Sequence, residues 1–161
     1  MKKLTIVRHA KSSWEYNLSD HERPLNARGF KDAGLVSNAL KHLELYFDKL
    51  ISSDAMRAKT TANIFVENLK IKKSICSLNR DLYDFSGEKL IQVIQSNSND
   101  INHLIVFGHN NAITSFVNLY GDVYFNNIPT CGVCILEFDI DEWRNLKQGK
   151  TIKTIFPKHL K

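Results

Sequence analysis

The stretch Leu4-Thr5-Ile6-Val7-Arg8-His9-Ala10-Lys11-Ser12-Ser13-Trp14 decides the fold of this chain. It opens as a short apolar run with β-branched residues, which is typical of a buried strand. The run then breaks into a guanidinium, an imidazole, an ammonium and two hydroxyl groups. Because α/β sheets bind ligands beyond the carboxyl ends of their strands, Arg8 and His9 are predicted to face an anionic ligand. A lone Arg-His pair is more often structural, so this interpretation depends on agreement elsewhere in the chain.

Strands and amphipathic helices alternate through the rest of the chain. Further strands are predicted at residues 49–52, 74–78, 103–107, 133–138 and 151–156. Helical apolar faces run from Phe30 to Phe47, from Ala58 to Leu69, from Leu90 to Ile94 and from Ile113 to Tyr120. This alternation predicts an α/β fold, a three-layer α/β/α sandwich with a mostly parallel central sheet and helices on both faces. The length of 161 residues suits a single domain, residues 1–161.

Polar residues mark the predicted helix starts. Asn26 is a suitable N-cap for the first helix, and Ser53 or Asp54 for the second. Arg57 lies in the first turn of the second helix, where a cation opposes the helix dipole. A bound anion would offset this small local cost, whereas the alternative is an ordinary arginine on a helix surface.

The composition bears on location and partners. The formal net charge is +5, and 43% of the residues are hydrophobic. No apolar run is long enough to span a bilayer and the N-terminus lacks a signal sequence, so a cytoplasmic protein without membrane attachment is expected. The positive charge would attract phosphorylated or acidic partners. Because no nucleic-acid-binding motif accompanies it, no nucleic acid partner is expected.

Two of the three cysteines have the spacing of a redox pair or of half a zinc site. Cys131 and Cys134 lack a second pair, and the residues that follow them are typical of a strand. Positions three apart on a strand face opposite sides of the sheet. We therefore expect small, buried, reduced thiols, and no metal site is predicted anywhere in the chain.

Four motifs recur at predicted strand ends and helix starts. They are Arg8-His9-Ala10-Lys11-Ser12-Ser13-Trp14, Arg23-Pro24-Leu25-Asn26-Ala27-Arg28-Gly29, Ser52-Ser53-Asp54-Ala55-Met56-Arg57-Ala58 and Gly108-His109-Asn110. In this order they resemble the histidine phosphatase superfamily, and the branch is similar to the small SixA-type phosphohistidine phosphatases. The resemblance covers nearly the whole chain and implies the same α/β/α fold.

The resemblance implies a role for each matching residue. His9 matches the nucleophile, which attacks phosphorus and becomes a phosphohistidine intermediate. Arg8 and Arg57 match the phosphate clamp, and His109 the second histidine of the pocket. Neighbouring cations should keep His9 neutral, and its other ring nitrogen should donate to a backbone carbonyl. Ala10 stands where the family has glycine, a departure that leaves the carbonyl in place.

Other polar residues are weaker candidates. Lys11, Ser12, Arg23 and Asn110 are expected to contact the phosphate or its carrier, with a loop role as the alternative for the first two. Asp84 is the candidate general acid, because Leu82-Tyr83-Asp84 occupies the place of a Leu-x-Glu segment in larger relatives. Asp84 equally suits a loop or helix-capping role, and Asp81 and Glu88 are lesser candidates. Arg28 is interpreted as mainly structural.

These observations lead to a function hypothesis with two alternatives. The first is a metal-independent phosphatase without a cofactor that acts on protein phosphohistidine, such as a phosphorylated histidine-containing phosphotransfer domain. The second is a phosphomonoesterase for a small metabolite or sugar phosphate, and the third is a phosphate-binding module without turnover. Residues 55–108 have room for two helices and one short strand, so no lid domain is expected. An open pocket suits a phosphate displayed on a protein surface.

Overall fold

The computed structural model describes residues 1–161, and its centre is a six-stranded sheet. The strands are β1 (Lys2–Arg8), β2 (Lys49–Ser52), β3 (Cys76–Leu78), β4 (His103–Gly108), β5 (Val133–Phe138) and β6 (Lys150–Ile155). Their order is β3-β2-β4-β1-β5-β6, in which the first four are parallel and β5 runs antiparallel to both its neighbours. The predicted strands and the mostly parallel sheet are confirmed.

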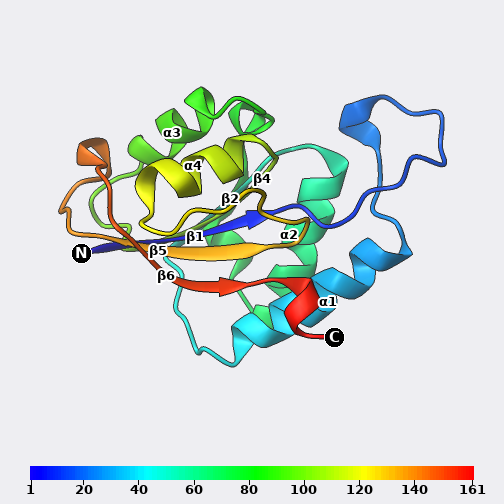
Figure 1. Ribbon diagram of the computed structural model, residues 1–161, viewed down its shortest axis with the longest axis horizontal. Coiled ribbons are helices and arrows are strands. Elements are labelled where there is room, and N and C mark those ends of the chain that lie inside the picture. The colour runs from blue at the N-terminus through cyan, green and yellow to red at the C-terminus, as the bar shows by residue number, and fades with distance from the viewer.

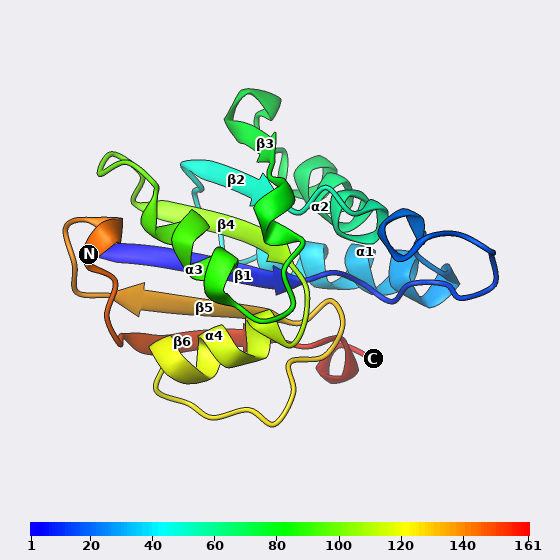
Figure 2. The ribbon, with the colours of Figure 1, turned by 90° about the horizontal axis from the view of Figure 1, so that it is seen from above.

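Helices cover both faces of this sheet, as Figures 1 and 2 show. They are α1 (Ala27–Lys41), α2 (Met56–Leu69), α3 (Glu88–Gln95) and α4 (Ala112–Tyr120). α1 and α2 pack on one face, and α3 and α4 on the other, so the predicted three-layer sandwich without a lid is confirmed. None of the helices combines the length and the apolar character needed to cross a membrane.

Alternating side chains of each strand enter different halves of the core. In β4, Ile105 and Phe107 pack with α1 and α2, whereas Leu104 and Val106 pack with α3 and α4. This period of two is what a strand buried on both faces requires. The two spaced cysteines also enter different halves of the core as free buried thiols: Cys134 packs from β5 into the second half, and Cys131 packs into the first half from the turn before that strand.

Helix α1 differs from the prediction in its length and its buried face. It ends at Lys41, well short of Phe47, and Phe30 lies exposed on its outer side. The helix gives way to a turn in which Glu44 adopts a left-handed conformation with φ of 53°. The exposure of Phe30 accompanies a close backbone approach at the preceding residue, because a Cβ added at Gly29 would lie 2.1 Å from the Lys11 carbonyl oxygen, so that Gly29 faces inward and its neighbour faces solvent. The predicted N-cap is confirmed, because the Asn26 side chain accepts from the Gly29 N–H at 2.8 Å.

Helix α2 starts differently from the prediction. Its N-cap residue is Ala55, which has no side-chain capping bond. The hydroxyl of Ser53 accepts from the Ala55 N–H at 3.2 Å, one residue before the helix, and it also bonds the ring of His109. Ser53 is therefore shared between the helix start and a histidine from the end of β4.

Parallel pairing places the carboxyl ends of three strands at one edge of the sheet. Arg8 at the end of β1 is in register with Gly108 of β4, and Ser52 of β2 with Phe107. The long segment that follows β1 projects beyond this edge before it returns to α1 (Figures 1 and 2). The predicted polar residues thus meet where such sheets bind their ligands.

Candidate active site

A cavity of about 460 Å³ lies at this edge, beyond the carboxyl ends of β1 and β4. Its lining comes from five separate parts of the chain: Arg8, His9, Lys11, Ser12, Trp14, Asp20, Arg23, Arg57, Phe85, His109, Asn110 and Thr130. Every predicted site residue except Asp84 is in this lining. The cavity holds four permanently cationic side chains and a single carboxylate, so it suits an anion.

His9 is held as a neutral imidazole with one nitrogen free to react. Its Nδ1 lies 2.7 Å from the Ala10 carbonyl oxygen and therefore carries the proton, which leaves a lone pair on Nε2. The Arg57 Nε–H donates to this Nε2 at 3.4 Å. Burial above all, and then the nearby cations led by Arg57, lower the pKa of His9 from 6.5 to about 3. The bond to Ala10 gives the expected tautomer, and burial contributes more than the cations to the neutral state.

The residue that departs from the family pattern is accommodated in the core. Ala10 is buried and packs with the α1 and α2 half of the core. Its N–H donates to the Thr61 hydroxyl of α2 at 3.0 Å, and that hydroxyl donates to the Arg57 carbonyl oxygen at 2.7 Å. These bonds fix the segment of the predicted nucleophile, His9, against the helix that carries Arg57.

One carboxylate connects the arginines of the cavity. Asp20 accepts from the Arg57 Nη2–H at 2.9 Å and from the Arg23 Nε–H at 3.2 Å, and its backbone carbonyl accepts from Arg57 Nη1 at 2.6 Å. The Tyr83 hydroxyl donates to the same carboxylate. Although partial desolvation opposes the shift, bonds from Tyr83, Arg57 and Arg23 lower the pKa of Asp20 to about 2. The cation at the start of α2 is thus offset by an internal anion.

Arg8 and His109 complete the floor of the cavity. Arg8 donates from Nη1 to the Ile128 carbonyl oxygen at 2.7 Å, while its buried Nε has no partner. The His109 ring lies 5.2 Å from the His9 ring, centroid to centroid, and its Nε2 bonds the Ser53 hydroxyl at 2.8 Å. The buried Nδ1 of His109 is unpaired. Burial above all, and then the nearby charge of Arg57, lowers the pKa of His109 to about 2.

The other predicted phosphate-contacting residues differ in how far their side chains are held by hydrogen bonds. Ser12 accepts from the buried Arg23 guanidinium at 2.7 Å and so positions it, whereas the Lys11 side chain is exposed. Asn110 accepts from the Thr114 N–H and hydroxyl in the first turn of α4 and donates to Asn127. Outside the cavity, Arg28 pairs with buried Asp32 at 3.5 Å, a structural contact.

Asp84 lies outside the cavity lining and serves as the cap of α3. Its carboxylate accepts from the backbone N–H groups of Ser86, Gly87 and Leu90 and from the Ser86 hydroxyl, at 3.0–3.1 Å. Despite its burial, these bonds lower the pKa of Asp84. With a lowered pKa the Asp84 carboxylate is ionised and holds no proton to donate, and its oxygens are already engaged by four hydrogen bonds. These observations favour the capping role over the role of general acid. The structure gives Asp84 no contact with the predicted nucleophile.

Sequence reasoning missed several residues of the cavity. Asp20 and Thr130 come from segments without periodicity, and nothing local marks them, whereas Trp14 ends the first motif but its residue type predicts no role in phosphate binding. Phe85 lies next to the candidate acid, and its ring packs 5.3 Å from the His109 ring. Only the tertiary arrangement identifies these four side chains.

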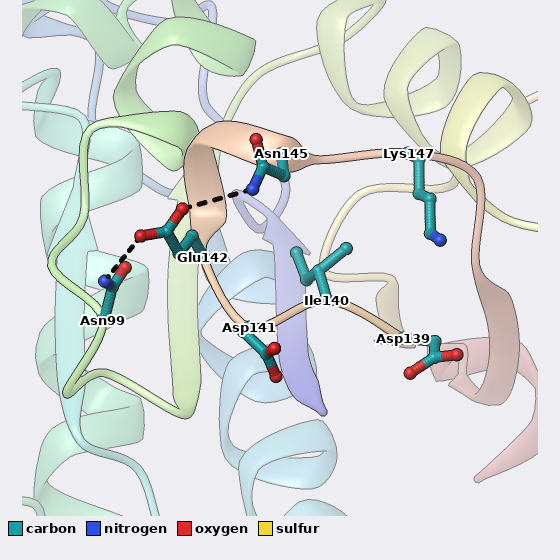
Figure 3. A pocket seen from close by; sticks show the side chains of 7 residues that line it. All are labelled: Asn99, Asp139, Ile140, Asp141, Glu142, Asn145 and Lys147. Atoms are coloured by element: carbon teal, nitrogen blue, oxygen red, sulfur yellow. Dashed lines mark hydrogen bonds between the residues drawn. The ribbon is translucent and has the colours of Figure 1, made fainter.

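A larger cavity, of about 640 Å³, lies at the opposite end of the sheet (Figure 3). It follows the end of β5, which is antiparallel to β1, and it is lined by Asn99, Asp139, Ile140, Asp141, Glu142, Asn145 and Lys147. Three carboxylates would repel a phosphate, and no histidine or arginine faces it. The smaller cavity around His9 is therefore the candidate site. No group of three or more His, Cys, Asp or Glu side chains in the chain is placed to hold a metal ion.

The fold and the cavity together define an α/β protein with a cationic site of histidines and arginines at the carboxyl ends of its parallel strands. The family model of the histidine phosphatase superfamily (branch 1) matches residues 4–82. The chain belongs to this superfamily, and it is a phosphatase, an enzyme of the hydrolase class.

The chain is also similar to a curated relative and to solved structures over nearly its whole length. An uncharacterised chloroplastic protein of Arabidopsis thaliana is 28% identical over 152 residues, 88% of this chain and 69% of that protein. The protein histidine phosphatase SixA in complex with tungstate superposes with a TM-score of 0.84 at 19% identity, over 99% of each chain. SixA from Agrobacterium tumefaciens gives 0.82 at 20% identity, over 97% of this chain and 98% of that one. The two structural matches show the fold.

Proposed function

We propose that this phosphatase is metal-independent, that it works through a phosphohistidine formed on His9, and that its substrate is protein phosphohistidine. The observation that carries the proposal is the neutral His9 ring. Its protonated Nδ1 is tied to a carbonyl, and its free Nε2 lies among Arg8, Arg57 and His109. A nucleophile needs this protonation state, and a phosphoryl group needs these cations.

The reaction then follows in two displacements. The His9 Nε2 lone pair attacks phosphorus while the bond between phosphorus and the substrate nitrogen breaks, and its electron pair returns to that nitrogen. The substrate imidazole, protonated on its other nitrogen, leaves as the neutral ring. Water next attacks the phosphoenzyme, releases phosphate and restores the His9 lone pair. Arg8 and Arg57 stabilise the equatorial oxygens in both steps.

The cavity favours a leaving group that needs no strong proton donor. Asp20 is its single carboxylate, and the two arginines keep that carboxylate ionised. Asp84 is engaged in capping α3. An alkoxide leaving group would require a proton from a general acid, whereas the nitrogen of a phosphorylated imidazole leaves readily. This chemistry supports phosphohistidine over the alternative substrate, a small metabolite or sugar phosphate ester.

The accessibility of the site also supports a substrate carried by a protein. No lid segment intervenes between β3 and β4, where the chain forms only a short 3-10 turn and α3. The structurally similar SixA protein is named a protein histidine phosphatase and binds tungstate, a tetrahedral oxyanion. A phosphorylated histidine-containing phosphotransfer domain is therefore the partner that we propose. We also propose a cytoplasmic location, which the three free thiols support.

Turnover of that partner, measured against a panel of phosphate esters, tests the proposal. Protein phosphohistidine should be hydrolysed with the larger kcat/KM, and rapid quenching in alkaline denaturant should trap phosphate on His9. The variant His9→Asn should lose the label and at least about a thousandfold of the rate. Faster turnover of an ester would favour the phosphomonoesterase, and binding without label in the wild type would favour a phosphate-binding module.

A further inference from the structure

Two exposed aromatic rings stand at the entrance of the cavity. Trp14 is 75% exposed and Phe85 is 45% exposed, although both line the same cavity as the nucleophile. By contrast, His9, Arg57 and His109 are buried. The cavity therefore has a buried polar floor and an exposed aromatic rim. Exposed large apolar side chains at such a position are typical of a binding surface.

Both rings are held in place by residues of the floor. The Arg23 guanidinium carbon lies 3.5 Å from the centroid of the Trp14 ring, and this arginine is itself buried and bonded to Ser12 and Asp20. The Phe85 ring packs 5.1 Å from Tyr83 and 5.3 Å from His109. Because they are supported in this way, the rings lose little freedom when a ligand contacts them.

The geometry of phosphoryl transfer determines which part of the substrate meets the rim. Attack is in line, so the leaving group departs on the side of phosphorus away from the His9 Nε2. His9 belongs to the floor, and the opposite side is the rim that carries Trp14 and Phe85. A leaving group with a flat ring would find two aromatic surfaces there, and stacked or edge contacts with them add to simple burial.

We propose that Trp14 and Phe85 bind the imidazole ring of the leaving group and so make this enzyme selective for phosphorylated histidine side chains. The inference rests on the proposed phosphatase reaction at His9. In this proposal Trp14 and Phe85 determine substrate specificity, and the buried residues of the cavity floor carry out the phosphoryl transfer. A purely structural role for Trp14, as a cover for Arg23, would affect all substrates alike.

Two small substrates with a P–N bond distinguish binding of the leaving-group ring from a purely structural role of Trp14. Free phosphohistidine carries the ring, whereas phosphoramidate has the same type of P–N bond without a ring. We would measure the ratio of kcat/KM for the two probes in the wild type, in Trp14→Leu and in Phe85→Leu. Each substitution should lower this ratio about three- to tenfold, and Trp14→Phe should restore most of it. Tyr16→Leu is the matched control, because Tyr16 is an exposed aromatic on the same loop outside the cavity lining.

The possible results separate a failure of ring binding by Trp14 and Phe85 from a failure of the proposed phosphatase reaction at His9. If Trp14→Leu slows both probes equally and Phe85→Leu leaves the ratio unchanged, the rings do not bind the leaving group, and the phosphatase reaction stands. If the wild type takes phosphate from neither probe and His9 is never labelled, the proposed reaction fails and the inference fails with it. A ratio that falls in both variants but not in the Tyr16 control supports the assignment.

Discussion

Mild acid should destabilise this protein because three buried histidines are neutral in the folded state. Burial lowers the pKa of His9 to about 3, of His103 to about 4 and of His109 to about 2. An unfolded chain binds a proton on each ring below about pH 6.5. Protonation therefore favours the unfolded state, and stability is lost as the pH falls from 6.5 toward the folded values.

The expected loss is large compared with the stability of a typical domain. Between pH 7 and pH 5 each neutral buried histidine costs about 2 kcal/mol, so the three together cost about 6 kcal/mol. Folded domains are stable by roughly 5–15 kcal/mol. The carboxylates with lowered pKa values, Asp20 and Asp84 among them, add to the loss only at lower pH. Their contribution is present above their unfolded pKa of about 3.9 and is lost as the pH falls through the folded values.

Urea unfolding at pH 7, 6 and 5 measures this loss. The buried Trp143 provides a fluorescence signal, and circular dichroism gives an independent one. His103→Gln should remove about one third of the pH dependence, about 2 kcal/mol, whatever it does to stability at pH 7. The exposed His159→Asn is the matched control. A total change below about 1 kcal/mol would mean that the folded protein protonates these rings, and the argument for a neutral nucleophile would fail.

Three further predictions concern the capping aspartate, a glycine contact and metals. Asp84→Ala should cost about 2 kcal/mol of unfolding free energy through the lost cap of α3 and change kcat/KM less than about twofold; a hundredfold loss in a folded variant would make Asp84 the general acid after all. Gly29→Ala should destabilise by about 2 kcal/mol and slow turnover, since the new Cβ meets the Lys11 carbonyl, whereas Gly34→Ala, with open space around it, should stabilise the helix by about 0.5 kcal/mol; equal effects on thermal unfolding would refute the contact. Prolonged treatment with EDTA should leave turnover unchanged, and a loss that added Mg²⁺ or Zn²⁺ restores would contradict the metal-independent reaction.

Local patterns predict the strands and most of the helices, because those patterns report burial directly. The apolar run of β4 occupies an interior position in the sheet. The meeting of Arg8, Arg57 and His109 also follows from the sequence, since parallel strands end at one edge. The outward position of Phe30 does not, because it depends on how closely Gly29 approaches a loop that the pattern leaves undefined.

Chemical role is harder to predict than position, because one residue type serves several roles. An aspartate after Leu82-Tyr83 suits a proton donor and a helix cap equally well, and only the bonds of Asp84 to the backbone of α3 separate them. Asp20 shows the converse. Its pairing with Arg23 is local, but its other partners, Arg57 and Tyr83, lie 37 and 63 residues away in the chain, so nothing nearby in the sequence marks its place in the site.

The bridging position of Asp20 follows from the charge that the site must manage in the absence of substrate. Arg57 stands at a helix N-terminus beside Arg23, so that two guanidinium groups and the helix dipole would repel one another without a nearby anion. Asp20 reaches both guanidinium groups from a 3-10 turn, on a segment that folds back from the nucleophile strand. One carboxylate against four cations still leaves the cavity positive enough for a phosphoryl dianion. The same bridge holds Arg57 beside the His9 Nε2 before substrate arrives, so under the proposed reaction the guanidinium is already placed next to the attacking nitrogen.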